Sequence, residues 1–150
     1  MRMRKMFLIA LALSLLLPGC VFHKRPRGQS FIGAVPDAPV AVIARDAAQR
    51  LADMYPPGRT SIHVSQAQNN DQAAFGATFE NELRAHGFRI VPEPGNGPDI
   101  VWTIDYLGHD IEPSIYALFR ITDQEGRKTV SRVYDKDGRA VSSFAQGIAE

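Results

Sequence analysis

The chain has 150 residues, of which 45% are hydrophobic and 22% are charged. That length fits one small domain with some extra residues at its ends, and the composition argues against a wholly disordered chain. The formal net charge is +1, and no basic stripe with interleaved aromatic residues occurs, which argues against direct nucleic-acid binding.

Residues 1–19 have the layout of a secretory signal peptide. Three cations near the start precede an apolar run of twelve residues, 6–17, that is broken only by Ser14. A helix of that length spans about 18 Å, which falls short of the roughly 30 Å of a bilayer's hydrocarbon core. We therefore expect residues 1–19 to be removed.

The residues around the expected cut, Leu17-Pro18-Gly19-Cys20, resemble the lipobox of bacterial lipoproteins. The resemblance implies cleavage between Gly19 and Cys20 and attachment of lipid, palmitate included, to Cys20. Two or more acyl chains anchor a protein stably, whereas one holds only marginally. Cys20 is the single cysteine, so the lipidated chain would have no free thiol and no disulfide. The alternative is a secreted protein in which Cys20 is merely the first mature residue.

Residues 20–38 are expected to form a flexible tether, because glycines and prolines interrupt them and no periodicity is sustained. Lys24, Arg25 and Arg27 make its first part basic, whereas residues 31–150 carry 11 basic and 16 acidic side chains. This basic segment could rest on anionic lipid head groups. A simply solvated tether is the alternative.

Residues 39–150 are predicted to form a single α+β domain that begins with two helices. After Asp37, a suitable N-cap, apolar residues recur at spacings of three and four, and a "YPPG" stretch then ends the first helix. The second helix is expected from about Gln72, with Phe75, Phe79 and Leu83 on one face and a C-cap at His86-Gly87. The first stripe consists of Val40, Ile43, Ala47, Leu51 and Met54.

Alternating or short apolar runs predict six strands. The stretches 123–127 and 135–139, each with an acidic residue before a glycine, are expected to be hairpin turns. The order α-β-α-β-β-β-β-β indicates two helices packed on one face of a mostly antiparallel sheet. The predicted strands are Thr60–Ser65, Phe88–Val91, Ile100–Leu107, Ile115–Ile121, Thr129–Tyr134 and Ala140–Ala145.

No motif supports catalysis or metal binding. "DKDGR" lacks the later ligands of a calcium loop, and His63, His86 and His109 show no zinc-ligand spacing. The sequence also lacks a G-x-S-x-G elbow and a phosphate-binding loop. We therefore predict no catalytic residue, no metal, no small-molecule substrate and no cofactor apart from the covalent lipid on Cys20.

Several stretches resemble the TrbH family of conjugal transfer lipoproteins. They are the lipobox, "VAVIARDAAQRLADMYPPGRTSIHV", "FGATFENELRAHGFRIV", and "YALFRI" followed by "VSRVYDKDGR". The resemblance implies a component of mating-pair formation, the type IV secretion apparatus that carries plasmid DNA between Gram-negative bacteria. Only Cys20 carries over as a functional residue, as the lipid attachment site.

The expected function is that of a non-enzymatic, lipid-anchored scaffold or stabiliser that contacts other proteins of the transfer channel. Val21 replaces the Asp that retains lipoproteins in the inner membrane of enteric bacteria, which favours the outer membrane facing the periplasm. An exposed edge of the late meander could bind a partner strand. The alternative is a general envelope lipoprotein, an assembly or activator module unrelated to conjugation. An envelope hydrolase, which would need a role for His109 or Asp110, has no supporting motif.

Overall fold

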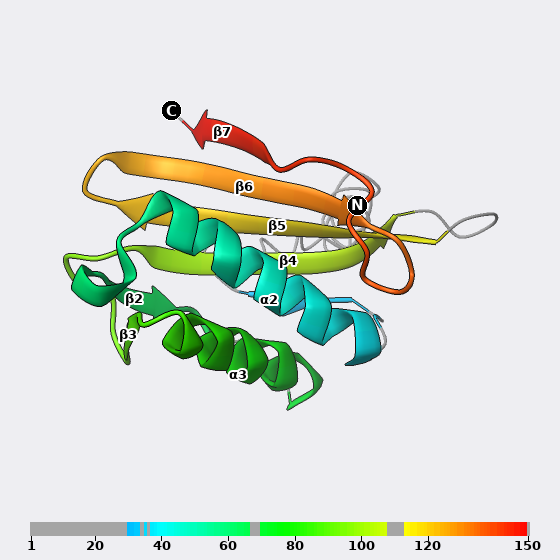
Figure 1. Ribbon diagram of the computed structural model, residues 1–150, viewed down its shortest axis with the longest axis horizontal. Helices are drawn as coiled ribbons and strands as arrows, with labels where there is room; N and C mark the ends of the chain where they lie inside the picture. Colours follow the sequence, from blue (N-terminus) through cyan, green and yellow to red (C-terminus); the bar gives the residue numbers. More distant parts are fainter. Residues whose placement is uncertain (1–29, 34, 36, 67–69, 108–112, 150) are drawn as a thin grey trace, which may run out of the picture.

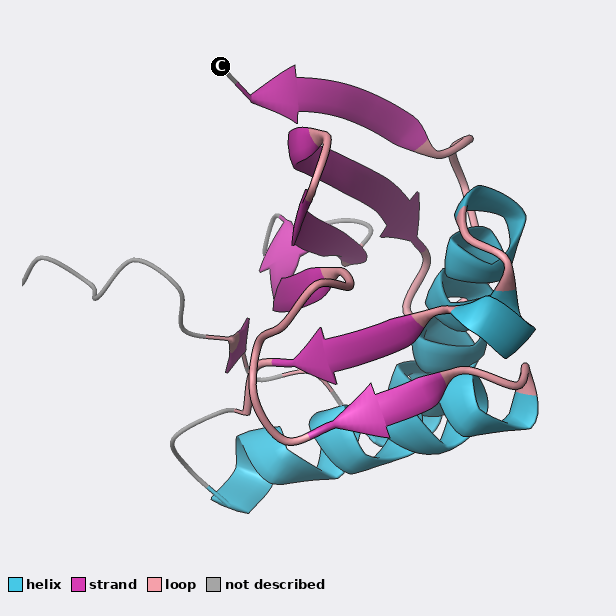
Figure 2. Ribbon diagram, turned by 90° about the vertical axis from the view of Figure 1, so that its left-hand side faces the viewer, coloured by secondary structure: helices cyan, strands magenta, loops and turns pink. Residues whose placement is uncertain are grey.

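Two helices cover one face of a single seven-stranded sheet in the computed structural model (Figures 1 and 2). The structure describes residues 30–33, 35, 37–66, 70–107 and 113–149. The helices are α2 (Asp37–Met54) and α3 (Asn70–Ala85), and a short 3-10 helix, η1 (Pro57–Arg59), follows α2. The strands are β1 (Phe31–Ile32), β2 (Ser61–Val64), β3 (Arg89–Val91), β4 (Asp99–Leu107), β5 (Ser114–Asp123), β6 (Gly126–Tyr134) and β7 (Ala145–Ala149).

The sheet confirms the predicted α+β class. Its spatial order is β3-β2-β4-β5-β6-β7, and β1 also pairs with β4. Strands β4 to β7 form an antiparallel meander that supplies most of the paired residues, whereas β1, β2 and β3 pair in parallel. The parallel pair β2 and β3 is joined by α3, as parallel neighbours require a crossover connection. After β1, the element order is the one the sequence predicts.

Both predicted apolar stripes face the sheet. On α2, Val40, Ile43, Ala47 and Leu51 are buried and Met54 packs against the core from its edge. On α3, the side chains of Phe75, Phe79 and Leu83 are fully buried. The ring of Phe75 lies 4.6 Å from that of Trp102 on β4 and 5.6 Å from that of Phe79, measured between centroids. An aromatic layer therefore joins α3 to the middle of the sheet.

The second helix ends at Ala85 and is capped by His86-Gly87, as predicted. Gly87 has a φ of +92°, which favours glycine. The Gly87 N–H donates to the Arg84 carbonyl at 2.9 Å, and the Phe88 N–H donates to the Leu83 carbonyl at 3.1 Å. These two bonds form a Schellman motif, which turns the chain from α3 directly into β3. The helix begins at Asn70, two residues before the predicted start.

Part of the expected tether belongs to the sheet. Phe31 and Ile32 form β1 and pair in parallel with Thr103 and Ile104 of β4. Because β5 occupies the other side of β4, β1 and β2 lie end to end along one side. The buried Ser30 joins them, since its hydroxyl donates to the Ser65 carbonyl at 2.8 Å and accepts from the Trp102 N–H at 3.3 Å.

The last strand lies later than predicted. The structure places it at Ala145–Ala149, and Ala140 makes only an isolated bridge to Tyr134. The first predicted hairpin turn is confirmed, because only Gln124 and Glu125 separate β5 from β6. The second predicted turn, 135–139, is confirmed too, since the Asp135 N–H donates to the Arg139 carbonyl at 2.8 Å and Tyr134 makes an antiparallel bridge to Ala140. The strand expected directly after this turn does not form, because the chain pairs again only from Ala145. The prediction of Ala140–Ala145 was therefore wrong.

The loop of residues 135–144 packs against the start of α2. Asp135 organises its turn, since its Oδ1 accepts the N–H groups of Asp137 at 2.9 Å and Arg139 at 2.8 Å. Gly138 has a φ of +82°, and a Cβ atom there would lie 3.0 Å from the Pro39 Cα. The chain thus needs several residues to pass over α2 before β7 can pair with β6.

Candidate functional site

The predicted lipid attachment site, Cys20, and the cleavage position, Gly19, lie outside the described residues, as do His109 and Asp110. Lipidation therefore stays a prediction. Among the helices that the structure describes, none is long and apolar enough to cross a membrane.

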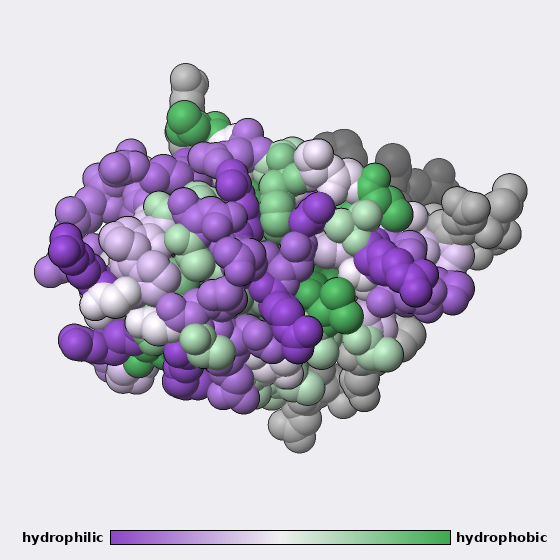
Figure 3. Space-filling model, in the orientation of Figure 1, coloured by the Kyte–Doolittle hydropathy of each residue, from purple (hydrophilic) through white to green (hydrophobic). Residues whose placement is uncertain are grey.

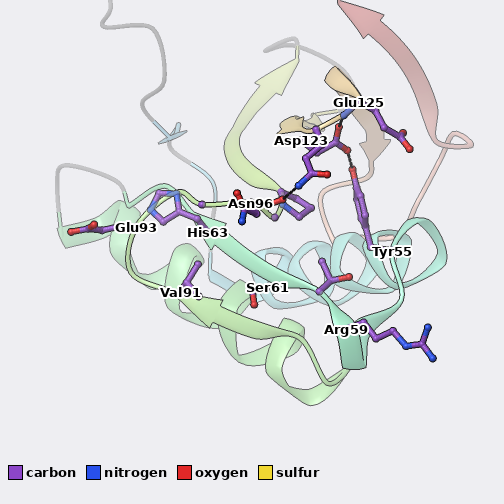
Figure 4. A pocket seen from close by; sticks show the side chains of 14 residues that line it. Tyr55, Arg59, Ser61, His63, Val91, Glu93, Asn96, Asp123 and Glu125 are labelled. Carbon is purple, nitrogen blue, oxygen red and sulfur yellow. Dashed lines mark hydrogen bonds between the residues drawn. The ribbon is translucent and has the colours of Figure 1, made fainter.

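A pocket of about 580 Å³ opens between β2, the loop of residues 92–98 and the β5–β6 turn (Figure 4). The Gln124 Nε2 donates to the Asn96 carbonyl at 3.2 Å and joins the loop to the turn. Figure 4 shows Arg59 and Glu93 at opposite ends of the pocket, both pointing away from its middle. The charged groups of this pocket therefore do not converge on one point where a substrate atom could react.

Tyr55 and Asp123 line one wall of the pocket and form an ionic cluster with Lys128, which does not line it. The Tyr55 hydroxyl donates to Asp123 Oδ2 at 2.6 Å, and the Lys128 ammonium donates to the same oxygen at 3.0 Å. The Lys128 ammonium also donates to Glu125 at 2.6 Å. The Asp123 side chain is only 8% exposed, so these bonds satisfy a carboxylate that is largely out of water.

The pKa shifts in this cluster favour a structural role. Burial, helped by the hydrogen bond to Asp123, raises the pKa of Tyr55 above its usual range. Burial opposes ionisation of Asp123, but the hydrogen bonds from Tyr55 and Lys128 outweigh it and lower the pKa of Asp123. Hydrogen bonds to Glu125 and Asp123 raise the pKa of Lys128. No member titrates near neutral pH, where a general acid or base works best.

A second wall carries His63, whose Nδ1 lies 2.7 Å from the Asp99 Oδ1. The two residues are register partners on the parallel strands β2 and β4. Figure 4 shows His63 on the side of the pocket away from Tyr55 and Asp123, so the two polar groups do not meet. Over the described parts of the chain, no group of three or more His, Cys, Asp or Glu side chains could hold a metal ion.

A third polar cluster joins β6 to α2. One terminal nitrogen of Arg132, Nη1, lies 2.9 Å from both carboxylate oxygens of Asp46, and the Tyr134 hydroxyl donates to Asp46 at 2.6 Å. The Arg132 Nε donates to the Ser142 carbonyl at 2.7 Å, and its guanidinium lies 4.6 Å from the centre of the Phe144 ring. The cluster fixes the loop that leads to β7. Sequence reasoning missed it because no local pattern pairs residues so far apart in the chain.

The edge strand β7 is the remaining candidate for a binding surface. It ends the sheet on one side, and its Ile148 side chain is 82% exposed. The Arg50 guanidinium of α2 donates to Gln146 at 3.0 Å and supports the strand from the helix side. This edge of the meander is the one expected from the sequence, but its strand begins at Ala145 and not at Ala140.

The fold and these clusters define a small two-layer α+β domain whose polar groups chiefly brace its own elements. The model of a family described as "Conjugal transfer protein TrbH" matches residues 25–147. The chain belongs to this TrbH family of conjugal transfer proteins, which confirms the resemblance and a role in conjugation. The family's description names no enzymatic activity. Neither a curated protein nor a solved structure matches the chain.

Proposed function

We propose that this protein is a non-catalytic, lipid-anchored scaffold that stabilises the conjugative transfer apparatus at the cell envelope. The family match supports the place in conjugation. The scaffold role rests on one observation: the polar clusters connect the protein's own helices and strands to one another. Asp46, Asp123 and Asp99 each bind side chains of neighbouring elements, and none points at a shared reaction centre. Such clusters fix a shape, which is what a scaffold needs.

The proposed anchor is a lipid on Cys20, and the start of the fold sets its reach. The described chain begins at Ser30, which is buried at the side of β4. Ten residue steps separate it from Cys20, which corresponds to at most about 35 Å of extended chain. The tether of residues 20–38 that the sequence predicted would have a much longer reach. A lipidated Cys20 would therefore hold the sheet close to the membrane surface.

The membrane we propose is the outer one, with the domain in the periplasm. Support comes from Val21, which follows Cys20 in place of the Asp that retains lipoproteins in the inner membrane. Lys24, Arg25 and Arg27 then lie between the anchor and the fold in the sequence, where cations favour anionic head groups. The proposed partners are other proteins of the transfer channel. We propose no nucleic acid or small-molecule ligand.

The test is an in-frame deletion of this chain in a donor strain, with mating frequency as the readout. A scaffold of the transfer apparatus predicts that transfer falls, that the full chain restores it, and that growth and envelope integrity do not change. If the protein were instead a general envelope module, its deletion should cause an envelope defect even in cells with no transfer system. Normal mating without the chain would exclude the proposed role.

A further inference from the structure

The two strands that end the sheet order, β3 and β7, differ in how well they are protected against strand addition. One edge is β3, which has three residues, begins with Arg89 and runs into Pro92 and Pro94. Short length, charge and proline are the usual devices that prevent another strand from pairing. The other edge, β7, has five residues, Ala145–Ala149, with no charge and no proline. Of these two end strands, only β7 therefore lacks these devices.

The β7 edge is also held in place before any partner arrives. On one side it pairs with β6 from Ser131↔Ala145 to Arg127↔Ala149. Hydrogen bonds from Arg50 to Gln146 and from Thr129 to the Gly147 carbonyl, at 3.0 and 3.4 Å, add side-chain support. No strand of the described chain pairs with its outer side. A preformed edge costs a partner less ordering entropy than a mobile segment would.

An apolar residue projects from this edge. Ile148 is the most exposed of the large hydrophobic side chains that the structure describes, at 82%. Figure 3 shows the helix-covered face as mainly hydrophilic, with separate small hydrophobic spots rather than one broad patch. A broad apolar contact over the helices is therefore not the natural mode of docking. A strand that adds to β7 would instead cover Ile148 with one of its alternate side chains.

The charge near β7 indicates the kind of strand that fits. Residues 126–150 carry five basic and three acidic side chains, whereas residues 31–125 carry six basic and thirteen acidic. The edge is thus the basic end of an acidic domain. Lys128 and Arg132 are neutralised within the fold by Asp123 and Asp46.

Two guanidinium groups beside β7 have no carboxylate partner among the described contacts. Arg127 is exposed and is the register partner of Ala149. It lies on the face away from the helices, because its neighbour Lys128 lies on the helix side against Tyr55. Arg50 lies on the helix side, where it binds the neutral Gln146, and its Nε is buried without a hydrogen bond. The strand is therefore flanked by one such cation on each face.

We propose that β7 binds an extended acidic segment of another protein of the transfer apparatus by strand addition. An apolar side chain of that segment covers Ile148, and its carboxylates pair with Arg127 and Arg50. The identity of the partner rests on the proposed function. A second copy of this chain fits less well, because its β7 edge, Ala145–Ala149, has no carboxylate to pair with Arg127 and Arg50.

The first experiment places a photo-crosslinking amino acid at position 148 of the full chain in donor cells that carry the whole transfer system. The matched control carries it at position 89, which is exposed on the protected edge β3. The expected result is an adduct at 148, and none at 89, in which mass spectrometry finds an acidic segment of another transfer protein. The proposal would be overturned if position 148 gave no adduct, or gave one with lipid or with a second copy of this chain.

The second experiment compares a negative and a positive substitution at the exposed position 148. The readout is how much of the partner identified in the adduct copurifies with each variant. Ile148→Asp removes the apolar contact and repels carboxylates, so we expect at least a roughly tenfold loss of binding. Ile148→Lys removes the same contact but adds a positive charge, which attracts carboxylates, so its loss should be smaller. Val141→Asp is the control, since Val141 is 60% exposed but lies outside β7. A larger loss for Lys than for Asp would exclude an acidic partner.

These outcomes are separable from a failure of the proposed function. If deletion of the chain leaves mating unchanged, the scaffold role in conjugation fails. The adduct at position 148 and the order of the Asp and Lys variants still decide whether β7 binds an acidic strand.

Discussion

The Tyr134 hydroxyl of β6 donates a 2.6 Å hydrogen bond to the Asp46 carboxylate of α2. Tyr134 is fully buried, and burial together with this bond raises its pKa above the usual range. Arg132 binds the same carboxylate and, through its Nε, the carbonyl of Ser142 in the loop before β7. One partly buried contact between a helix and a strand is therefore linked, through Arg132, to the loop that leads to the last strand.

Replacing Asp46 is expected to destabilise the fold. Asp46→Ala leaves the Tyr134 hydroxyl and the Arg132 guanidinium without their acceptor, at a cost of about 1–3 kcal/mol in the free energy of unfolding. Denaturant titration measures this loss. Tyr134→Phe, which removes only the hydroxyl, should cost about 1 kcal/mol. Asp53→Ala is the control, since Asp53 is exposed near the end of the same helix. Equal effects at Asp46 and Asp53 would contradict the bracing role of the cluster.

The Tyr55–Asp123–Lys128 cluster predicts a loss of stability in acid. The folded state lowers the pKa of Asp123, so the folded protein binds its proton less readily than the unfolded chain does. Its stabilising contribution is therefore fully present above the ordinary carboxyl pKa of about 4 and is lost as the pH falls through the lower folded value. Unfolding measured from pH 7 to pH 2 should show a smaller acid dependence for Asp123→Asn than for the natural protein. Identical slopes would exclude this contribution.

The same cluster predicts a separate effect in alkali. The pKa of Tyr55 is raised, so its contribution is present below the ordinary tyrosine pKa of about 10 and is lost as the pH rises through the folded value. Tyr55→Phe keeps the ring but removes the hydroxyl, and it should flatten the alkaline fall in stability. Absorbance at the tyrosinate wavelength would follow the ionisation. Tyr116, which is half-buried on β5, provides a matched Tyr→Phe control.

Ser30 is expected to matter for stability although it precedes the predicted start of the domain at residue 39. Ser30→Ala removes the acceptor of the Trp102 N–H and the donor to the Ser65 carbonyl, which should cost about 1–3 kcal/mol. The exposed Ser143→Ala serves as the control. Thermal unfolding should likewise show that a chain starting at residue 30 is more stable than one starting at residue 39. Equal stability of the two chains would mean that β1 contributes nothing to the fold.

Gly138 is expected to tolerate no side chain. Its φ of +82° is unfavourable for other residues, and a Cβ atom would lie 3.0 Å from the Pro39 Cα and 3.1 Å from the Val42 Cβ. Gly138→Ala should therefore destabilise the protein by about 1–3 kcal/mol. Gly95→Ala is the control, because a Cβ atom there meets nothing within 4 Å. A neutral Gly138→Ala would contradict the close packing of the loop on α2.

The helices could be predicted from the sequence because a helix buried on one side has apolar residues at regular spacings. Phe75, Phe79 and Leu83 recur every four residues and all face the core. The two errors, at β1 and β7, occur where the apolar pattern is weak or misleading. β1 has only two residues, too few for an alternating pattern. β7 has the sequence AQGIA, whose alanines and glycine favour strands poorly, so the stretch before it was preferred.

The polar clusters could not be predicted, for a different physical reason. The Tyr55 hydroxyl and Asp123 are 68 positions apart, and Tyr134 and Asp46 are 88 apart. Local spacing carries no information about such pairs, because only the folded sheet brings them together. The basic residues near the C-terminal end, which are scattered between residues 127 and 139, were not singled out from the sequence. Their meaning depended on knowing that β7 is an open edge.

The most direct measurement compares the natural chain with Cys20→Ser in donor cells, following lipid on the mature N-terminus, membrane fractionation and mating frequency together. We predict that the natural protein carries acyl chains on Cys20, fractionates with the outer membrane and supports transfer. The Cys20→Ser protein should lose the lipid, leave the outer membrane fraction and support transfer poorly. A Cys20→Ser protein that remains with the outer membrane and transfers DNA normally would contradict the proposed anchored scaffold.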